Sequence, residues 1–122
     1  MSTLTANKSL EVDKLVEADL AFQTLSISTG TVNANLNSQF FYHAKVTLTE
    51  DITLNLQNAV NGGYGTIIID QDATGGRTVT LPANSKVIGG SLSLASGANE
   101  RTILTYLFDG TDFNWNFGGN YS

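Results

Sequence analysis

The stretch from Thr102 to Phe117, TILTYLFDGTDFNWNF, constrains the fold more strongly than any other part of the chain. Asp109-Gly110 at its centre predicts a β-hairpin, because both residue types tolerate the positive φ values that a two-residue type I′ loop requires. With that loop, the predicted cross-strand pairs are Phe108–Thr111, Tyr106–Phe113, Leu104–Trp115 and Thr102–Phe117. This register gathers the apolar and aromatic side chains on one face of the ribbon, and a slip by one residue would scramble that arrangement.

The composition also favours strands. Only 14% of the 122 residues are charged, and Thr, Asn and Gly are abundant instead. Thr is common in strands, whereas Asn and Gly are common in tight turns. The length fits one domain with a short extension, and so weakly charged a surface fits a protein that is built into a larger assembly.

Residues 31–122 contain a series of short segments in which apolar and polar residues alternate, separated by Gly- and Asn-rich turns. The clearest are residues 39–48 and residues 52–57. The GTIIIDQ run at residues 65–71 is also a predicted strand, and its three consecutive isoleucines predict burial on both faces. Alternation with a period of two is typical of half-buried strands, and a regular series of them predicts a sandwich or barrel. We therefore expect an all-β head domain over residues 31–122, an antiparallel β-sandwich of jelly-roll-like form.

A second hairpin is predicted around the loop formed by residues 73–76. A loop of this length places Asp72 opposite Arg77 and, deeper in the ribbon, Asp70 opposite Val79. Opposite charges then meet beside the loop, which stabilises an antiparallel pair.

Residues 1–30 form an N-terminal segment with an apolar pattern of its own. Leucines recur every five residues in the unit SLEVDKLVEA and its echo DLAFQTLSIS. Such a spacing drifts around a helix but can stay on one side of an extended or β-type shaft, although heptad-like spacing and good helix formers leave a short helix as the alternative. In either conformation the apolar side chains lack partners nearby and are predicted to pack on another chain. The predicted anchoring and oligomerisation residues are Leu10, Val12, Leu15, Leu20, Phe22 and Leu25.

No catalytic or metal-binding pattern is visible. The chain has no cysteine, and its one histidine, His43, lies in an alternating strand with no nucleophile-elbow sequence in the chain. Asp72 is explained by the cross-strand Arg77, and Asp109 is explained by its turn. The paired glycines mark β-turns rather than a phosphate-binding loop. We therefore expect no enzyme activity, no cofactor and no metal ion.

Charge and hydropathy argue against nucleic-acid and membrane partners. The net charge is −5, and the six Lys and Arg residues are scattered rather than gathered into a basic stripe. No stretch approaches the roughly 18 apolar residues of a membrane-spanning helix, and the N-terminus shows no secretory signal pattern.

Three aromatic residues are candidates for stacking on a sugar. Trp115 falls on the apolar face of the predicted hairpin, which favours a core or interface position. Tyr64 and Tyr121 have no such explanation and remain candidate contacts for a glycan.

Two runs in the second half of the chain resemble a module common in bacteriophage tail-fibre and other virion proteins. Residues 65–82, GTIIIDQDATGGRTVTLP, match its hydrophobic strand, D-x-T-G-G-R-type turn and T-L-P stop. Residues 86–115 match the apolar Gly-Gly stretch, the next strand, the D-G-T turn and the aromatic strand that close the module. The resemblance covers about half the chain and brings no catalytic residues with it.

The resemblance implies a non-enzymatic virion structural protein. Members of this kind usually form homotrimers, with an N-terminal portion that joins the capsid or tail and a β-rich distal head. Because this chain has almost no shaft, the resemblance implies a short head fibre, a capsid decoration protein or a fibre tip. Such a protein would attach to capsid or tail proteins through residues 1–30 and be assembled in the bacterial host cytoplasm. The alternative is a receptor-binding module that adheres to host-surface glycans.

Overall fold

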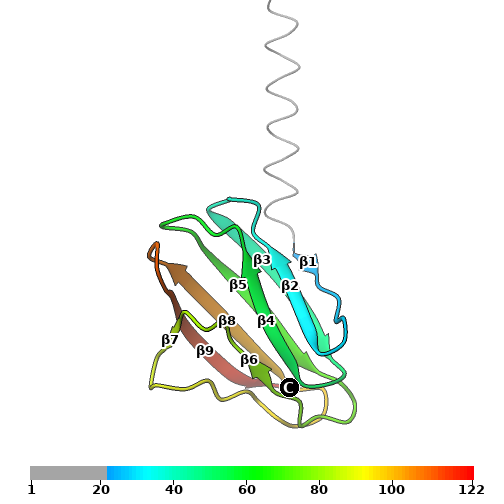
Figure 1. Ribbon diagram of the computed structural model, residues 1–122. Coiled ribbons are helices and arrows are strands. Elements are labelled where there is room, and N and C mark those ends of the chain that lie inside the picture. Colours follow the sequence, from blue (N-terminus) through cyan, green and yellow to red (C-terminus); the bar gives the residue numbers. More distant parts are fainter. Residues whose placement is uncertain (1–21) are drawn as a thin grey trace, which may run out of the picture.

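The computed structural model describes residues 22–122 and shows two β-sheets packed against each other (Figure 1). The six-stranded sheet has the order β1 (Gln23–Thr24), β3 (Phe41–Leu48), β5 (Tyr64–Gln71), β8 (Arg101–Phe108), β9 (Phe113–Tyr121) and β7 (Ser85–Val87). The three-stranded sheet has the order β2 (Thr31–Asn35), β4 (Ile52–Gln57) and β6 (Val79–Thr80). The predicted all-β sandwich is confirmed. Within residues 22–122, no helix is long and apolar enough to cross a membrane.

The strand directions differ from the predicted antiparallel, jelly-roll-like arrangement. Only the β5–β8 and β8–β9 pairs are antiparallel, whereas the other strand pairs of both sheets run parallel. The cause is that the chain alternates between the two sheets from β1 to β6. A chain that crosses to the opposite sheet and returns re-enters the first sheet in its original direction, so neighbouring strands are parallel. Turn residues predict each reversal of the chain but not that the reversal also changes sheet.

The core lies between the sheets, where alternate residues of each strand point inward. In β5, for example, Ile67 and Ile69 are fully buried, while Ile68 between them faces outward and is only partly buried, so the predicted burial of this strand on both faces is wrong. Gly65 in the same strand cannot carry a side chain, because the Tyr42 carbonyl oxygen and the Tyr106 ring occupy the space that a Cβ would need. The buried residues of the core cluster are Val32, Ala34, Leu36, Tyr42, Ala44, Val46, Leu48, Ile52, Leu54, Ile67, Ile69, Leu104, Tyr106, Phe113 and Trp115.

The last hairpin forms as predicted, but with a longer loop. The observed pairs are Phe108–Phe113, Leu107–Asn114, Tyr106–Trp115 and Leu104–Phe117, so the predicted register is wrong by two residues. The Asp109 side chain explains the loop, since its Oδ1 accepts the N–H groups of Thr111 (2.9 Å) and Asp112 (2.7 Å). Only Gly110 in the loop has a positive φ, of 94°. Because side chains alternate with a period of two, this shift leaves the predicted apolar face intact.

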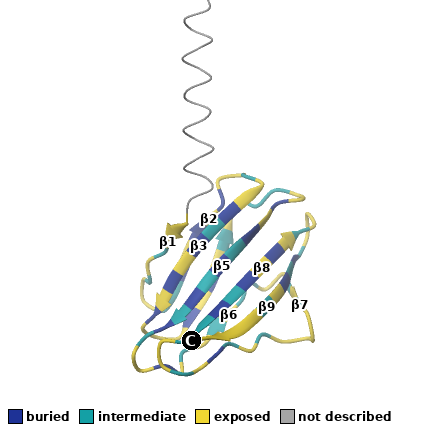
Figure 2. Ribbon diagram, turned by 180° about the vertical axis from the view of Figure 1, so that it is seen from behind, coloured by how far each residue is buried: buried dark blue, intermediate teal, exposed yellow. Residues whose placement is uncertain are grey.

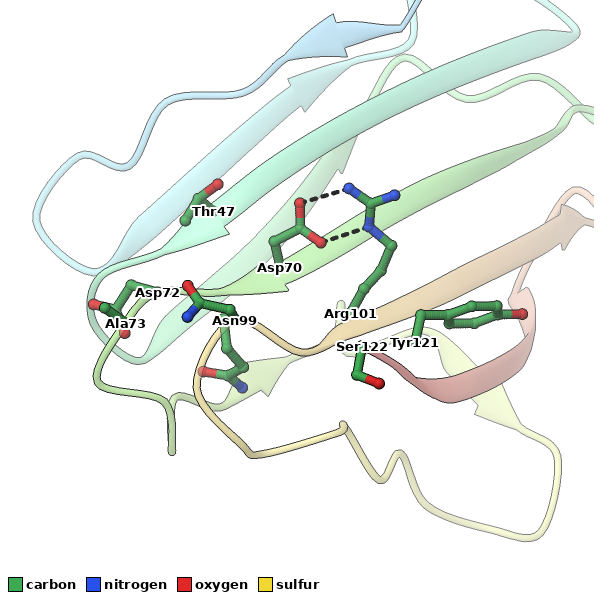
Figure 3. A pocket seen from close by; sticks show the side chains of 9 residues that line it. Thr47, Asp70, Asp72, Ala73, Asn99, Arg101, Tyr121 and Ser122 are labelled. Atoms are coloured by element: carbon green, nitrogen blue, oxygen red, sulfur yellow. Dashed lines mark hydrogen bonds and ion pairs between the residues drawn. The ribbon is translucent and has the colours of Figure 1, made fainter.

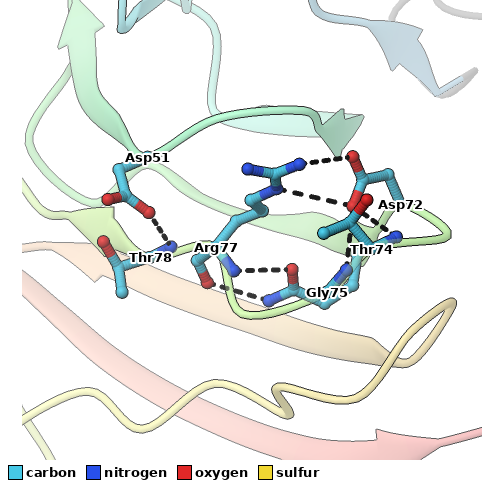
Figure 4. A network of polar contacts seen from close by, with 7 residues as sticks. Asp51, Asp72, Thr74, Gly75, Arg77 and Thr78 are labelled. Atoms are coloured by element: carbon cyan, nitrogen blue, oxygen red, sulfur yellow. Dashed lines mark hydrogen bonds and ion pairs between the residues drawn. The ribbon is translucent and has the colours of Figure 1, made fainter.

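The loop after β5 contains the predicted Asp72–Arg77 pair but does not form a hairpin. The Arg77 guanidinium lies 3.1 Å from the Asp72 carboxylate, which also accepts two N–H groups of the loop (Figure 4). Beyond this loop the chain crosses to the other sheet, where Val79 pairs with Ile52. The predicted pairing of Asp70 with Val79 is therefore wrong.

Candidate functional site

The outer face of the six-stranded sheet carries two regions of opposite chemistry at its two ends. Along the strands of this sheet, buried and exposed residues alternate (Figure 2). The cross-strand register orders the outward-facing side chains into rows that run from β3 through β5 to β8. The first and last of these rows define the two regions.

The first row is apolar. Phe41, Tyr64 and Leu107 are cross-strand neighbours, and their exposed fractions are 42%, 44% and 52%. The Phe41 and Tyr64 rings meet edge to face, with centroids 4.7 Å apart. The Phe22 ring contacts the ring of His43, which follows Phe41 by two residues in β3. Ile88 and Leu107 line the same shallow depression. The apolar end, as we call it, consists of Phe22, Phe41, Tyr64, Ile88 and Leu107, five of the seven large hydrophobic residues exposed within residues 22–122.

Two of the six predicted anchoring residues lie within the described part of the chain. Phe22 is on the outer face, its ring centroid 5.4 Å from that of His43. Leu25 packs against this chain's own core, and its N–H donates to the Lys45 carbonyl oxygen at 2.9 Å. The others, Leu10, Val12, Leu15 and Leu20, lie outside the described residues. The anchoring role of all six stays a prediction, as does the domain boundary at residue 30, although β1 already pairs with β3.

The last row is polar. Thr47, Asp70, Arg101 and Tyr121 are successive cross-strand neighbours on β3, β5, β8 and β9. Arg101 donates from Nε to Asp70 Oδ1 at 2.6 Å and from Nη2 to Oδ2 at 3.0 Å, which makes a bidentate ion pair (Figure 3). The row borders an open pocket of about 670 Å³. We call this region the polar end, and its lining residues are Thr47, Asp70, Gln71, Asp72, Ala73, Asn99, Arg101, Tyr121 and Ser122.

Each aspartate of the polar end has an arginine partner. Asp70 pairs with Arg101, and Asp72 pairs with Arg77. The hydrogen bond from Arg77 lowers the pKa of Asp72. The hydrogen bond to Asp70 raises the pKa of Arg101. At neutral pH these two ion pairs carry no net charge.

The structure separates the two predicted glycan contacts. Tyr64 is the first residue of β5 and lies in the apolar end. Tyr121 lies in the same row as Arg101 and Asp70, and Asp70 is six residues after Tyr64 along β5. At about 3.3 Å per residue of strand, the two tyrosines lie about 20 Å apart. They therefore cannot contact the same sugar ring.

The remaining candidates show packing rather than chemistry. Trp115 is 2% exposed, and its indole N–H donates to Ser85 Oγ at 2.9 Å, so its predicted core position is confirmed. His43 packs against Phe22. Among residues 22–122, no three His, Asp or Glu side chains are gathered closely enough to hold a metal ion.

Arg101 and Asn99 are among the residues of the polar end that were not found from the sequence. Arg101 reaches Asp70 across 31 residues of chain, and no local pattern links them. Asn99 enters the pocket from the loop before β8, in a left-handed conformation with φ of 61°. Neither the spacing nor the residue type marks these side chains, because only the approach of β8 and its preceding loop to β5 brings Arg101 to Asp70 and Asn99 to Asp72.

Comparison with protein families matches residues 27–113 to a family described as "Putative phage tail fibre C-terminal domain". The match covers 87 of the 122 residues and extends from the segment after β1 to the first residue of β9. No curated protein and no solved structure matches the chain. The resemblance seen in the sequence is thereby confirmed. The chain belongs to this family of phage tail fibre C-terminal domains and is a virion-associated structural protein of a phage.

Proposed function

We propose that this chain is a non-enzymatic short fibre or capsid decoration protein that forms a homotrimer and attaches to the particle through residues 1–30. Membership of a phage tail fibre family supports the structural role. The observation that carries the trimer is the apolar end, where five large hydrophobic side chains are exposed on one sheet face.

A second copy of the chain is a suitable partner for this surface. Contiguous exposed hydrophobic side chains mark interaction sites, whereas scattered ones are ordinary. Phe41, Tyr64 and Leu107 are direct cross-strand neighbours on three adjacent strands. Aromatic residues are enriched in the centres of protein interfaces. Each copy in a closed ring of identical chains can bury the same set of side chains.

The connectivity of the chain favours the same partner. Residues 1–21 lead into Phe22 and β1, and β1 runs parallel to β3 from the apolar end towards the polar end. Copies that associate through their N-terminal segments would therefore have their apolar ends nearest to one another. The polar ends would lie away from the junction.

The trimer is tested with Leu107→Lys in the full chain, measured by light scattering coupled to size exclusion. We expect the wild type to have the mass of three 13.0 kDa chains, and the variant to need at least about tenfold more protein to remain trimeric, a loss of about 1.4 kcal/mol. Tyr121→Lys is the matched control, since Tyr121 is 50% exposed on the same face but at the other end. A monomeric wild type, or equal effects of both variants, contradicts the proposal.

Attachment is tested by deleting residues 1–21, which keeps β1 and Leu25 in place. We expect circular dichroism to show an intact β fold and purified particles to lack the truncated protein. Particles that carry the truncated protein at the normal copy number would contradict attachment through the N-terminal segment.

Adhesion to host-surface glycans is the second candidate function. The open polar pocket beside Tyr121 favours it, because sugar-binding sites combine an aromatic ring with several polar side chains. The test is a glycan array probed with the full-length protein, and the absence of any bound glycan would count against adhesion.

A further inference from the structure

We propose that the pocket of the polar end binds a neutral saccharide, with Tyr121 as the stacking side chain and Tyr64 excluded from the site. This inference rests on the second candidate function, adhesion to glycans, and specifies the site and the class of ligand.

The size of the pocket suits one or two sugar rings. Its volume is about 670 Å³, within the range of about 300–1,000 Å³ that is usual for small-molecule sites. It is open to solvent, and eight of its nine lining residues carry a polar side-chain group. An open, polar pocket suits a hydroxyl-rich ligand better than an apolar one, which needs enclosure.

The charges of the pocket favour a neutral ligand. Asp70 is neutralised by Arg101 at 2.6 Å, and Asp72 is neutralised by Arg77 at 3.1 Å. An anionic ligand would have to compete with a carboxylate for either arginine, and a cation would have to compete with an arginine for either carboxylate. A neutral ligand can instead bind without breaking an ion pair.

The ion pair also leaves groups that match a pair of neighbouring hydroxyls. Arg101 uses Nε and Nη2 to hold Asp70, so its Nη1 donors stay available. Each carboxylate oxygen of Asp70 accepts one of these hydrogen bonds and keeps capacity for another. A fixed donor beside a fixed acceptor is complementary to sugar hydroxyls, which both donate and accept.

Asn99 adds a second planar polar group at the rim. Its backbone N–H donates to the Asp72 carbonyl oxygen at 2.9 Å, which fixes its position beside the loop after β5. Its side-chain amide, which can both donate and accept, lines the pocket (Figure 3). The polar groups thus come from the loops after β5 and before β8 and from strands β3, β5, β8 and β9 of the large sheet.

The Tyr121 ring provides a flat apolar surface at the border of the pocket. The ring extends back along β9 over Gly118, which has no side chain. The Tyr121 hydroxyl lies 3.7 Å from the position that a Cβ of Gly118 would occupy. Figure 3 shows the ring pointing away from the Asp70–Arg101 pair. With half of its surface exposed, one ring face is available to the C–H groups of a sugar that lies at the border of the pocket.

Tyr64 has no such polar side chains as neighbours in its row. Its neighbours are Phe41, in edge contact with its ring, and Leu107 on the next strand. A sugar stacked on Tyr64 would lose water from its hydroxyls without polar side chains to replace it. Tyr64 therefore belongs with the apolar end and its protein interface.

The test is an NMR titration of the ¹⁵N-labelled full chain with a fixed panel of glucose, galactose, mannose and N-acetylglucosamine, with sialic acid as the anionic comparison. We expect saturable shifts of the Asn99, Arg101 and Tyr121 amides with at least one neutral sugar, and weaker shifts with sialic acid. No shift at these amides with any neutral sugar, or shifts centred on Tyr64, would overturn the proposal.

Variants in the full chain provide the second measurement. Tyr121→Ala should weaken binding at least about tenfold, whereas Tyr121→Phe keeps the ring and should stay within about threefold of wild type. Tyr64→Ala is the matched control and should bind like wild type. If a glycan array shows binding that Tyr121→Ala retains, the site is wrong while adhesion stands. If the titration maps to the pocket but the array shows nothing, the site stands and adhesion is wrong.

Discussion

The two ends of the large sheet share the same strands but are built differently beneath the surface. Under the apolar end lie Tyr106, Phe113 and Trp115, at most 4% exposed, with ring centroids 5.4 to 6.1 Å apart. Under the polar end lie Gln71 and Thr102, the two buried polar residues found within residues 22–122. One end is therefore held by aromatic packing and the other by hydrogen bonds.

The chain segments that pack over the core at each end explain this difference. At the polar end, backbone groups without strand partners must be satisfied by side chains. Gln71 donates to the carbonyl oxygens of Arg77 and Ala95 and accepts the Arg77 N–H, while Thr102 Oγ1 accepts the Ala95 N–H at 2.8 Å. A core covered by irregular chain thus needs buried polar side chains, whereas a core covered by regular strand pairs can be wholly apolar.

The largest effect in this comparison is expected from Trp115→Ala, which should lower the free energy of unfolding by about 3–5 kcal/mol. The variant loses the packing against Tyr106 and Phe113 as well as the hydrogen bond to Ser85. Urea unfolding followed by circular dichroism measures the loss. Asn116→Ala, at the exposed position next to it, is the control and should stay within about 0.5 kcal/mol of wild type.

Gln71→Ala should have the second largest effect, a loss of about 1–3 kcal/mol, because it leaves backbone groups of Arg77 and Ala95 buried without partners. The same unfolding experiment measures it, with the exposed Thr47→Ala as the control at the same end. If Gln71→Ala costs as much as Trp115→Ala, the two ends do not differ in the way described above.

The smallest effect is electrostatic and compares the loops at the two ends. At the polar end, the hydrogen bond from Arg77 lowers the pKa of Asp72. At the apolar end, hydrogen bonds from the Asp112 N–H and the Asn114 side chain lower the pKa of Asp109. Both carboxyls therefore stabilise the fold above their unfolded pKa of about 4, and this contribution is lost as the pH falls through the lower folded values.

Asp72→Asn and Asp109→Asn separate these two contributions. Each variant should show a smaller drop in its urea midpoint between neutral pH and about pH 3 than wild type does. The reduction should be larger for Asp72→Asn, which also removes an ion pair. An unchanged acid response in both variants would show that the two loops do not contribute to acid sensitivity.

Local sequence patterns predicted the strands and, for many of them, which side chains share a face of the sheet. Alternation identified the strands that became β3 and β4, a run of isoleucines identified β5, and the apolar face of the last hairpin was correct even though its register was wrong by two residues. The alternating strands and the hairpin face depend on a period of two, which the sequence carries directly. The Asp72–Arg77 pair was also predictable, because one short loop joins the two residues.

The contacts that define the candidate site could not be predicted in the same way. Arg101 meets Asp70 because β8 returns beside β5, and Tyr121 joins them because β9 pairs with β8. The register also decided that Tyr64 and Tyr121 lie at opposite ends of one face, which residue type alone left open.

The sequence by itself determined that this chain forms short strands, where those strands turn and which side chains share a face, because each of these depends on residues a few positions apart. Only the tertiary structure decided which sheet each strand joins, and hence that most pairs are parallel. A turn fixes a change of direction but not the sheet that the next strand enters, since that choice depends on burying both apolar faces together. The same long-range packing gathered a polar pocket with paired charged side chains at one end of the sheet and an exposed apolar surface at the other.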